Sequence, residues 1–145
     1  MSETKTSERV QAQSLTQFLV ENPQLDVTEE VFISPRFKEL GFKFKISAMS
    51  GEEFSSYQKE ATAVGRHRKV SFDNKRFNEL VVINHTVNPN FKDVETLKSA
   101  NCTSPEQFLY RSLRAGEIME LANQITALSG FDPDPEALVD EVKNS

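Results

Sequence analysis

The N-terminal part of the chain carries apolar residues at helical spacing. Leu15, Phe18 and Leu19 fall on one side of a helix that the pattern predicts over residues 12–21. The pair at residues 22–23, Asn-Pro, ends the pattern, because proline cannot continue a helix and restricts the residue before it. The sequence therefore predicts a short first helix with one apolar face.

A strand pattern follows this helix. Apolar and polar side chains alternate over residues 42–47, with Phe42, Phe44 and Ile46 on one face, which is typical of a half-buried strand. A second apolar run at residues 31–33 precedes it, and a segment with proline and glycine lies between the two. We expect the two runs to pair as an antiparallel hairpin. Because a two-stranded ribbon is marginal alone, its apolar face should pack on helices.

Two helices are predicted in the middle of the chain. The first begins at Ser50 or Gly51 and continues to Gly65, which stands at the usual position of a helix terminator. The second is capped by Asp73. Its segment 80–83 is rich in β-branched residues and also fits a buried strand, but the polar residues before it favour a helix.

The strongest helix signals lie in the last third of the chain. Residues 104–107, SPEQ, have the form of a capping box with proline at the first helical position. Two apolar stripes follow, and we expect Gly116 to break or kink the run between them. Gly130 and Phe131 fit a helix end closed by a Schellman turn. The stripes are Phe108, Leu109 and Leu113, then Ile118, Leu121, Ala122, Ile125 and Leu128.

These elements predict an α+β fold, a mostly α-helical single domain with a small antiparallel β-hairpin in its N-terminal half. A chain of 145 residues has the size of one domain and buries enough surface to fold without a disulfide or a metal. We expect a flexible N-terminal tail over residues 1–12. The folded domain is predicted over residues 13–131, and an acidic C-terminal helix and tail over residues 132–145.

The C-terminal segment holds most of the net charge. Of the total of −5, residues 131–145 carry −4, from five acidic residues and one lysine, and the rest of the chain carries −1. Leu138, Val139 and Val142 lie among these acids and predict a short helix. A helix this short is marginal in water, so we expect it to dock on its own domain or on a partner.

One electropositive cluster interrupts the nearly neutral body of the chain. It is a candidate phosphate-binding patch for RNA or DNA, with Phe72 beside it for stacking. The favoured interpretation is a solvated connector between two helices, because the body has no field that would gather nucleic acid. The less favoured alternative is therefore a small nucleic-acid-binding regulatory protein that uses the basic segment 66–76. The cluster consists of Arg66, Arg68, Lys69, Lys75 and Arg76.

No motif for catalysis or for a cofactor occurs in the sequence. His67, His85 and Cys102 lack the spacing of a metal site, and there is no nucleophile elbow and no glycine-rich phosphate loop. We predict no enzymatic activity, no cofactor and no metal. No window approaches the roughly 18 consecutive apolar residues of a membrane helix, and no signal peptide is apparent, so we expect a cytoplasmic protein.

Several short motifs, in their order and spacing, resemble a known family. The sequence is similar to the XkdN-like tail assembly chaperones of PBSX-type prophages and related phages over residues 13–143. An upstream ISPR and the strand near Phe44 fit as well. The motifs are VNPNFKD at residues 87–93, SPEQFL at 104–109, LRAGEI at 113–118 and LSGF at 128–131.

The resemblance implies a binding role without catalysis, because the family has no known catalytic residues. Its members are thought to bind the long tape measure protein, to hold its apolar helices soluble and to help recruit tail tube subunits. They are typically absent from the finished particle, and many are also made in a longer, frameshifted form. For this chain we expect a cytoplasmic location in the bacterial host and absence from the mature virion; self-association is left open.

We expect much of the client surface, the surface that binds the tape measure protein, to lie on the helices over residues 104–129 and 135–143. The candidate side chains are apolar and follow helical spacing. They are Phe108, Leu109, Leu113, Ile118, Leu121, Ile125, Leu138, Val139 and Val142.

Overall fold

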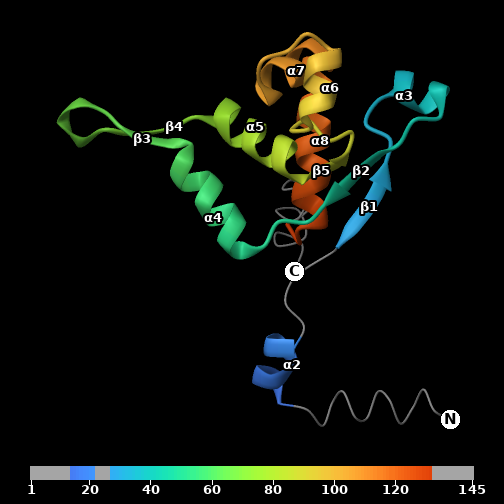
Figure 1. Ribbon diagram of the computed structural model, residues 1–145. Helices are drawn as coiled ribbons and strands as arrows, with labels where there is room; N and C mark the ends of the chain where they lie inside the picture. The colour runs from blue at the N-terminus through green and yellow to red at the C-terminus, as the bar shows by residue number, and fades with distance from the viewer. Residues whose placement is uncertain (1–13, 22–26, 132–145) are drawn as a thin grey trace, which may run out of the picture.

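Two helices side by side form the centre of the molecule, and the other elements are arranged around them (Figure 1). A computed structural model describes residues 14–21 and 27–131 of the chain. Figure 1 shows a small sheet on one side of the central pair α5 and α8, and helix α4 with a projecting hairpin on the other. The predicted α+β fold is confirmed. In chain order the elements are α2 (Leu15–Glu21), β1 (Thr28–Val31), α3 (Pro35–Leu40), β2 (Phe44–Ser47), α4 (Gly51–Glu60), β3 (Thr62–Val64), a 3₁₀ turn (Arg66–Arg68), β4 (Val70–Phe72), α5 (Asn74–His85), β5 (Thr86–Asn88), α6 (Val94–Ser99), α7 (Pro105–Ser112) and α8 (Ala115–Leu128).

The predicted hairpin exists, within a larger sheet. Strands β1 and β2 pair antiparallel, with Val31 opposite Phe44, and the connector between them contains helix α3. Strand β5 pairs with the other edge of β2, so the sheet has three strands in the order β1-β2-β5. Phe44 and Ile46 are buried as predicted, whereas Phe42 is exposed because it precedes the strand. Strand β5 escaped prediction because three residues directly after a helix show no period of their own.

Helix α4 begins as predicted and ends earlier. The Ser50 hydroxyl accepts a hydrogen bond from the Glu53 N–H (3.1 Å), and the Glu53 carboxylate accepts one from the Ser50 N–H (2.9 Å), which completes a capping box. The helix ends at Glu60, not at Gly65. Residues 62–64 instead form strand β3, because they pair with β4 in a hairpin that the sequence analysis missed.

The segment 80–83 lies within helix α5, as predicted. Asp73 caps this helix by accepting a hydrogen bond from the Arg76 N–H (3.1 Å). All four residues of the segment are buried, because α5 packs against α4, α7 and α8 at once. A helix covered on several sides has a continuous apolar run in its sequence, which is why the run also resembled a strand.

The two C-terminal helices meet at Leu113 and Arg114. Leu113 has extended backbone angles after α7, and α8 begins at Ala115, so Gly116 lies in the first turn of α8 and does not break the run. The capping box predicted for α7 is half formed. Ser104 accepts from the Gln107 N–H, but the Gln107 side chain accepts from the N–H of Thr103.

The predicted Schellman turn closes α8. Gly130 has a positive φ of 99°, and its N–H donates to the Ala127 carbonyl, while the Phe131 N–H donates to the Thr126 carbonyl. The Phe131 ring then packs against Phe54 of α4, with 4.9 Å between ring centroids. The end of α8 is therefore fixed beside the start of α4.

A buried ion pair joins α3 to the start of α8. The Glu117 carboxylate, 4% exposed, accepts hydrogen bonds from Arg36 Nε (2.6 Å) and Nη2 (2.7 Å), from the Ser34 hydroxyl (2.7 Å) and from the Arg114 N–H (2.8 Å). These bonds, those from Arg36 first, lower the pKa of Glu117 to about 2. The carboxylate is thus held ionised and fixes the α3 connector on the core.

Candidate functional site

Six of the predicted partner-binding side chains contribute to the domain's own core. They are Phe108, Leu109, Leu113, Ile118, Leu121 and Ile125, of which all but the partly exposed Phe108 are buried. Partner binding through the buried five stays a prediction, and it would require α7 or α8 to separate from the core. The other three candidates, Leu138, Val139 and Val142, lie outside the described residues.

The outer side of α7 and α8 carries a different apolar surface. Tyr110 and Met119 are 42% and 57% exposed, and they line a pocket of about 220 Å³ together with Ala115 and the edge of Ile118. Lys75 forms one rim, with its ammonium 5.0 Å from the centroid of the Tyr110 ring. We call these residues the α7–α8 face. Its apolar floor and single cation suit a helix with apolar and acidic side chains.

Tyr110 is held rigidly on this face. Its hydroxyl donates a hydrogen bond to Glu79 Oε2 (2.6 Å), and Glu79 is itself paired with Arg76. Burial and the bond to Glu79 raise the pKa of Tyr110 above its usual value. A fixed aromatic side chain loses little conformational entropy on binding a partner, which is a common property of binding surfaces.

The basic cluster predicted from the sequence is divided in the structure. Arg66, Arg68 and Lys69 lie at the exposed tip of the β3–β4 hairpin. Arg76, in contrast, lies on α5, where its guanidinium pairs with Glu60 (3.4 Å), Glu79 (3.3 Å) and Glu106 (3.5 Å). Lys75 lies over Tyr110. The five cations thus do not form one continuous patch, and this weakens the case for a phosphate-binding site.

The β3–β4 hairpin projects from the body of the molecule (Figure 1). We call residues 62–72 the arm. Val64 pairs with Val70, and Thr62 pairs with Phe72, so all four side chains lie on one face of the two-stranded ribbon. Val64, Val70 and Phe72 are 70%, 64% and 45% exposed. The sequence signal was present as two short alternating runs, TAV and VSF, on either side of residues 65–69.

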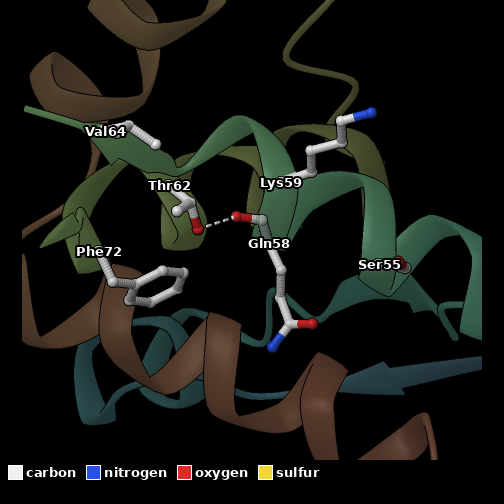
Figure 2. Close-up of a pocket in the computed structure, with 6 residues that line it drawn as sticks. All are labelled: Ser55, Gln58, Lys59, Thr62, Val64 and Phe72. Carbon is white, nitrogen blue, oxygen red and sulfur yellow. Dashed lines mark hydrogen bonds between the residues drawn. The ribbon is translucent and has the colours of Figure 1, made fainter. Parts of the chain in front are cut away.

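A groove runs between this face of the arm and helix α4. It has a volume of about 660 Å³. Figure 2 shows Phe72 turned toward the groove, and it shows Thr62 bonded back to α4 through its hydroxyl, which donates to the Gln58 carbonyl (2.6 Å). The groove is lined by Ser55, Gln58, Lys59, Thr62, Val64 and Phe72.

The buried His85 belongs to a structural polar cluster. Its Nε2 lies 2.7 Å from the Tyr57 hydroxyl and its Nδ1 lies 3.2 Å from the Ser47 hydroxyl, so both ring nitrogens have partners. Burial lowers the pKa of His85, against the opposing effect of Glu53. The cluster links α4, β2 and α5. Across the described part of the chain, no three His, Cys, Asp or Glu side chains are arranged to hold a metal ion.

No described helix is of the length and apolarity needed to cross a membrane.

The first helix, α2, is confirmed where it was predicted, and none of its residues is buried. Helix α2, the arm and the α7–α8 face each carry large apolar side chains that are exposed to solvent.

Comparisons with known proteins find one family and two similar proteins. Residues 15–143 match the family model described as phage XkdN-like tail assembly chaperone protein. The protein YqbN of Bacillus subtilis (strain 168) is 33% identical over 125 residues, which cover 79% of this chain and 83% of YqbN. The phage-like element PBSX protein XkdN of the same organism is 28% identical over 106 residues, covering 70% of this chain and 72% of XkdN. The crystal structure of YqbN superposes with a TM-score of 0.61 at 27% identity, covering 83% of this chain and 99% of that one.

Proposed function

Because the chain belongs to the family of phage XkdN-like tail assembly chaperones, we propose that it binds the tape measure protein of a phage or prophage tail, keeps it soluble and helps to recruit tail tube subunits. The role is one of binding without catalysis. The protein acts in the cytoplasm of the bacterial host and leaves before the virion is complete.

The observation that best supports this proposal is the α7–α8 face. The domain already has a closed core, yet it presents Tyr110 and Met119 in an apolar pocket on the helices in which the client surface was expected. A holding chaperone needs such a surface, because apolar helix faces of the client must be covered reversibly. The C-terminal segment, with Leu138, Val139 and Val142, forms the second part of the proposed client surface.

A charge on the α7–α8 face is expected to weaken binding of the tape measure protein. Met119→Glu would place a carboxylate in the apolar contact, where desolvation costs at least about 1.4 kcal/mol and hence roughly tenfold in Kd. The matched control is Val94→Glu, which changes an exposed apolar residue of α6 to the same side chain. Fluorescence titration of the labelled chaperone with a soluble tape measure fragment measures both variants.

Equal affinities for Met119→Glu and Val94→Glu would place the client elsewhere on the molecule. Circular dichroism of both variants checks that the fold is retained. In the same titration, deletion of residues 132–145 examines the second part of the client surface, and it is expected to weaken binding while the body stays folded.

A further inference from the structure

The groove between α4 and the arm has an apolar side, formed by Val64 and Phe72, and cations at Lys59 and at the tip of the arm. We propose that the chain's own acidic segment, residues 132–145, docks on it in the free protein. The docking concerns the free chaperone, before the client engages the same segment, so it does not depend on the identity of the client. It assigns a specific site to the docking that the sequence analysis expected of this segment.

The exposed apolar face of the arm would be more stable if another segment packed against it. A two-stranded ribbon is marginally stable alone, and this one presents Val64, Val70 and Phe72 together on one face. The base of the arm touches the body through Phe72, whose ring lies 5.6 Å from that of Phe77, and through the Thr62 hydroxyl, which donates to the Gln58 carbonyl. Burying the exposed face would stabilise the arm, since the removal of apolar side chains from water is favourable.

The cations around the groove are complementary in charge to the acidic segment, residues 132–145. The tip of the arm carries Arg66, Arg68 and Lys69, and Lys59 lies on the wall of the groove. Within the described residues none of these four cations takes part in an ion pair. The segment 132–145 carries five acids against one lysine, and it is the only strongly acidic stretch of a chain whose remainder is nearly neutral.

The acidic segment begins close to the groove, directly after Phe131. The last described residue, Phe131, packs on Phe54 (4.9 Å), Phe54 packs on Phe77 (5.6 Å), and Phe77 packs on Phe72 (5.6 Å). This row of rings leads from the end of α8 to the groove. Along α4 from Phe54 the chain rises by about 10 Å, and the strand to the tip adds about 13 Å. Fourteen residues span roughly 20 Å as a helix and more than 40 Å when extended, so a helical segment reaches the groove and a partly extended one also reaches the tip.

The composition of the segment fits both parts of the site. Leu138, Val139 and Val142 can cover Phe72 and Val64, while the acids around them face the cations of the rim. A tethered segment also has an effective concentration of the order of millimolar, which favours it over a second copy at low protein concentration. The site is therefore filled from within the same chain.

Zero-length cross-linking of the full chain tests this proposal. A carbodiimide joins carboxylates to lysine amines that are in contact, and mass spectrometry identifies the pairs. At low micromolar concentration we expect Asp140 and Glu141 to link to Lys59 and Lys69 several-fold more often than to Lys98, an exposed lysine on α6 that serves as the control. Mixing isotope-labelled and unlabelled chains shows whether a link joins two molecules.

The double variant Arg66→Glu, Arg68→Glu reverses two of the four cationic side chains and keeps the two reactive lysines. We expect it to lose most links to Lys59 and Lys69, with an unchanged circular dichroism spectrum and an unchanged yield at other lysines. The proposal is overturned by links distributed evenly over all lysines, by links that survive the charge reversal, or by links that join labelled to unlabelled chains, which would assign the groove to a second copy. The client is absent from the experiment, so its outcome leaves the proposed function untouched.

Discussion

Replacing Leu121 with alanine is expected to lower the free energy of unfolding by about 3 kcal/mol, because it removes a fully buried side chain from the centre of α8 and leaves a cavity. Urea unfolding followed by circular dichroism measures the change. The matched control is Met119→Ala on the same helix, where the side chain is mostly exposed and the expected change is within about 0.5 kcal/mol.

The comparison also separates two roles for the apolar residues of α8. If Leu121 belongs to the core, its loss is a loss of stability, and binding to a partner changes only through unfolding. If it also contacts a partner in an opened state of α8, then Leu121→Ala would still lower the stability, and it would in addition lower the affinity of chaperone that is fully folded. Equal stability of Leu121→Ala and Met119→Ala would contradict the packing described above.

The second large effect is expected from Glu117→Gln. The pKa of Glu117 is lowered to about 2 from an ordinary value of 4.5, so the ionised carboxylate favours the folded state by on the order of 3 kcal/mol at neutral pH. This stability is fully present above pH 4.5, and it is lost as the pH falls toward 2. The variant keeps the shape of the side chain but removes the charge that Arg36 requires.

Unfolding curves measured from pH 7 down to pH 2 test this prediction. We expect the wild type to exceed Glu117→Gln by about 2 to 3 kcal/mol at pH 7 and by almost nothing near pH 2. Glu95→Gln, an exposed acid on α6, should show no comparable difference at either pH. A constant gap between wild type and Glu117→Gln over the whole range would show that packing, not charge, fixes α3 on the core.

The elements that the sequence predicted best are those whose signals are local. The cap of α5 at Asp73 and the Schellman turn at Gly130 depend on residues within one helical turn, and both are present in the structure. The arm and strand β5 depend on pairing between distant or very short runs, so a pass along the chain overlooked them. The ion pair between Arg36 and Glu117 joins residues 81 positions apart, so no local sequence pattern predicts it.

The candidate client surface illustrates a different limit. Apolar spacing shows that one side of a helix is to be buried, but it does not tell whether the domain itself or a partner buries it. Leu121 and Ile125 follow the stripe and lie in the core, whereas Tyr110 and Met119, off the stripe, form the exposed α7–α8 face. Only the three-dimensional packing separates the two sets.

The most direct test of the proposed function is co-expression with the candidate tape measure protein, followed by size-exclusion chromatography with light scattering. Our account predicts that the long protein becomes soluble and elutes with the chaperone in a complex of defined mass. If the long protein stays insoluble while the chaperone elutes alone at every salt concentration, the account is contradicted, because a chaperone for this client must hold it in solution.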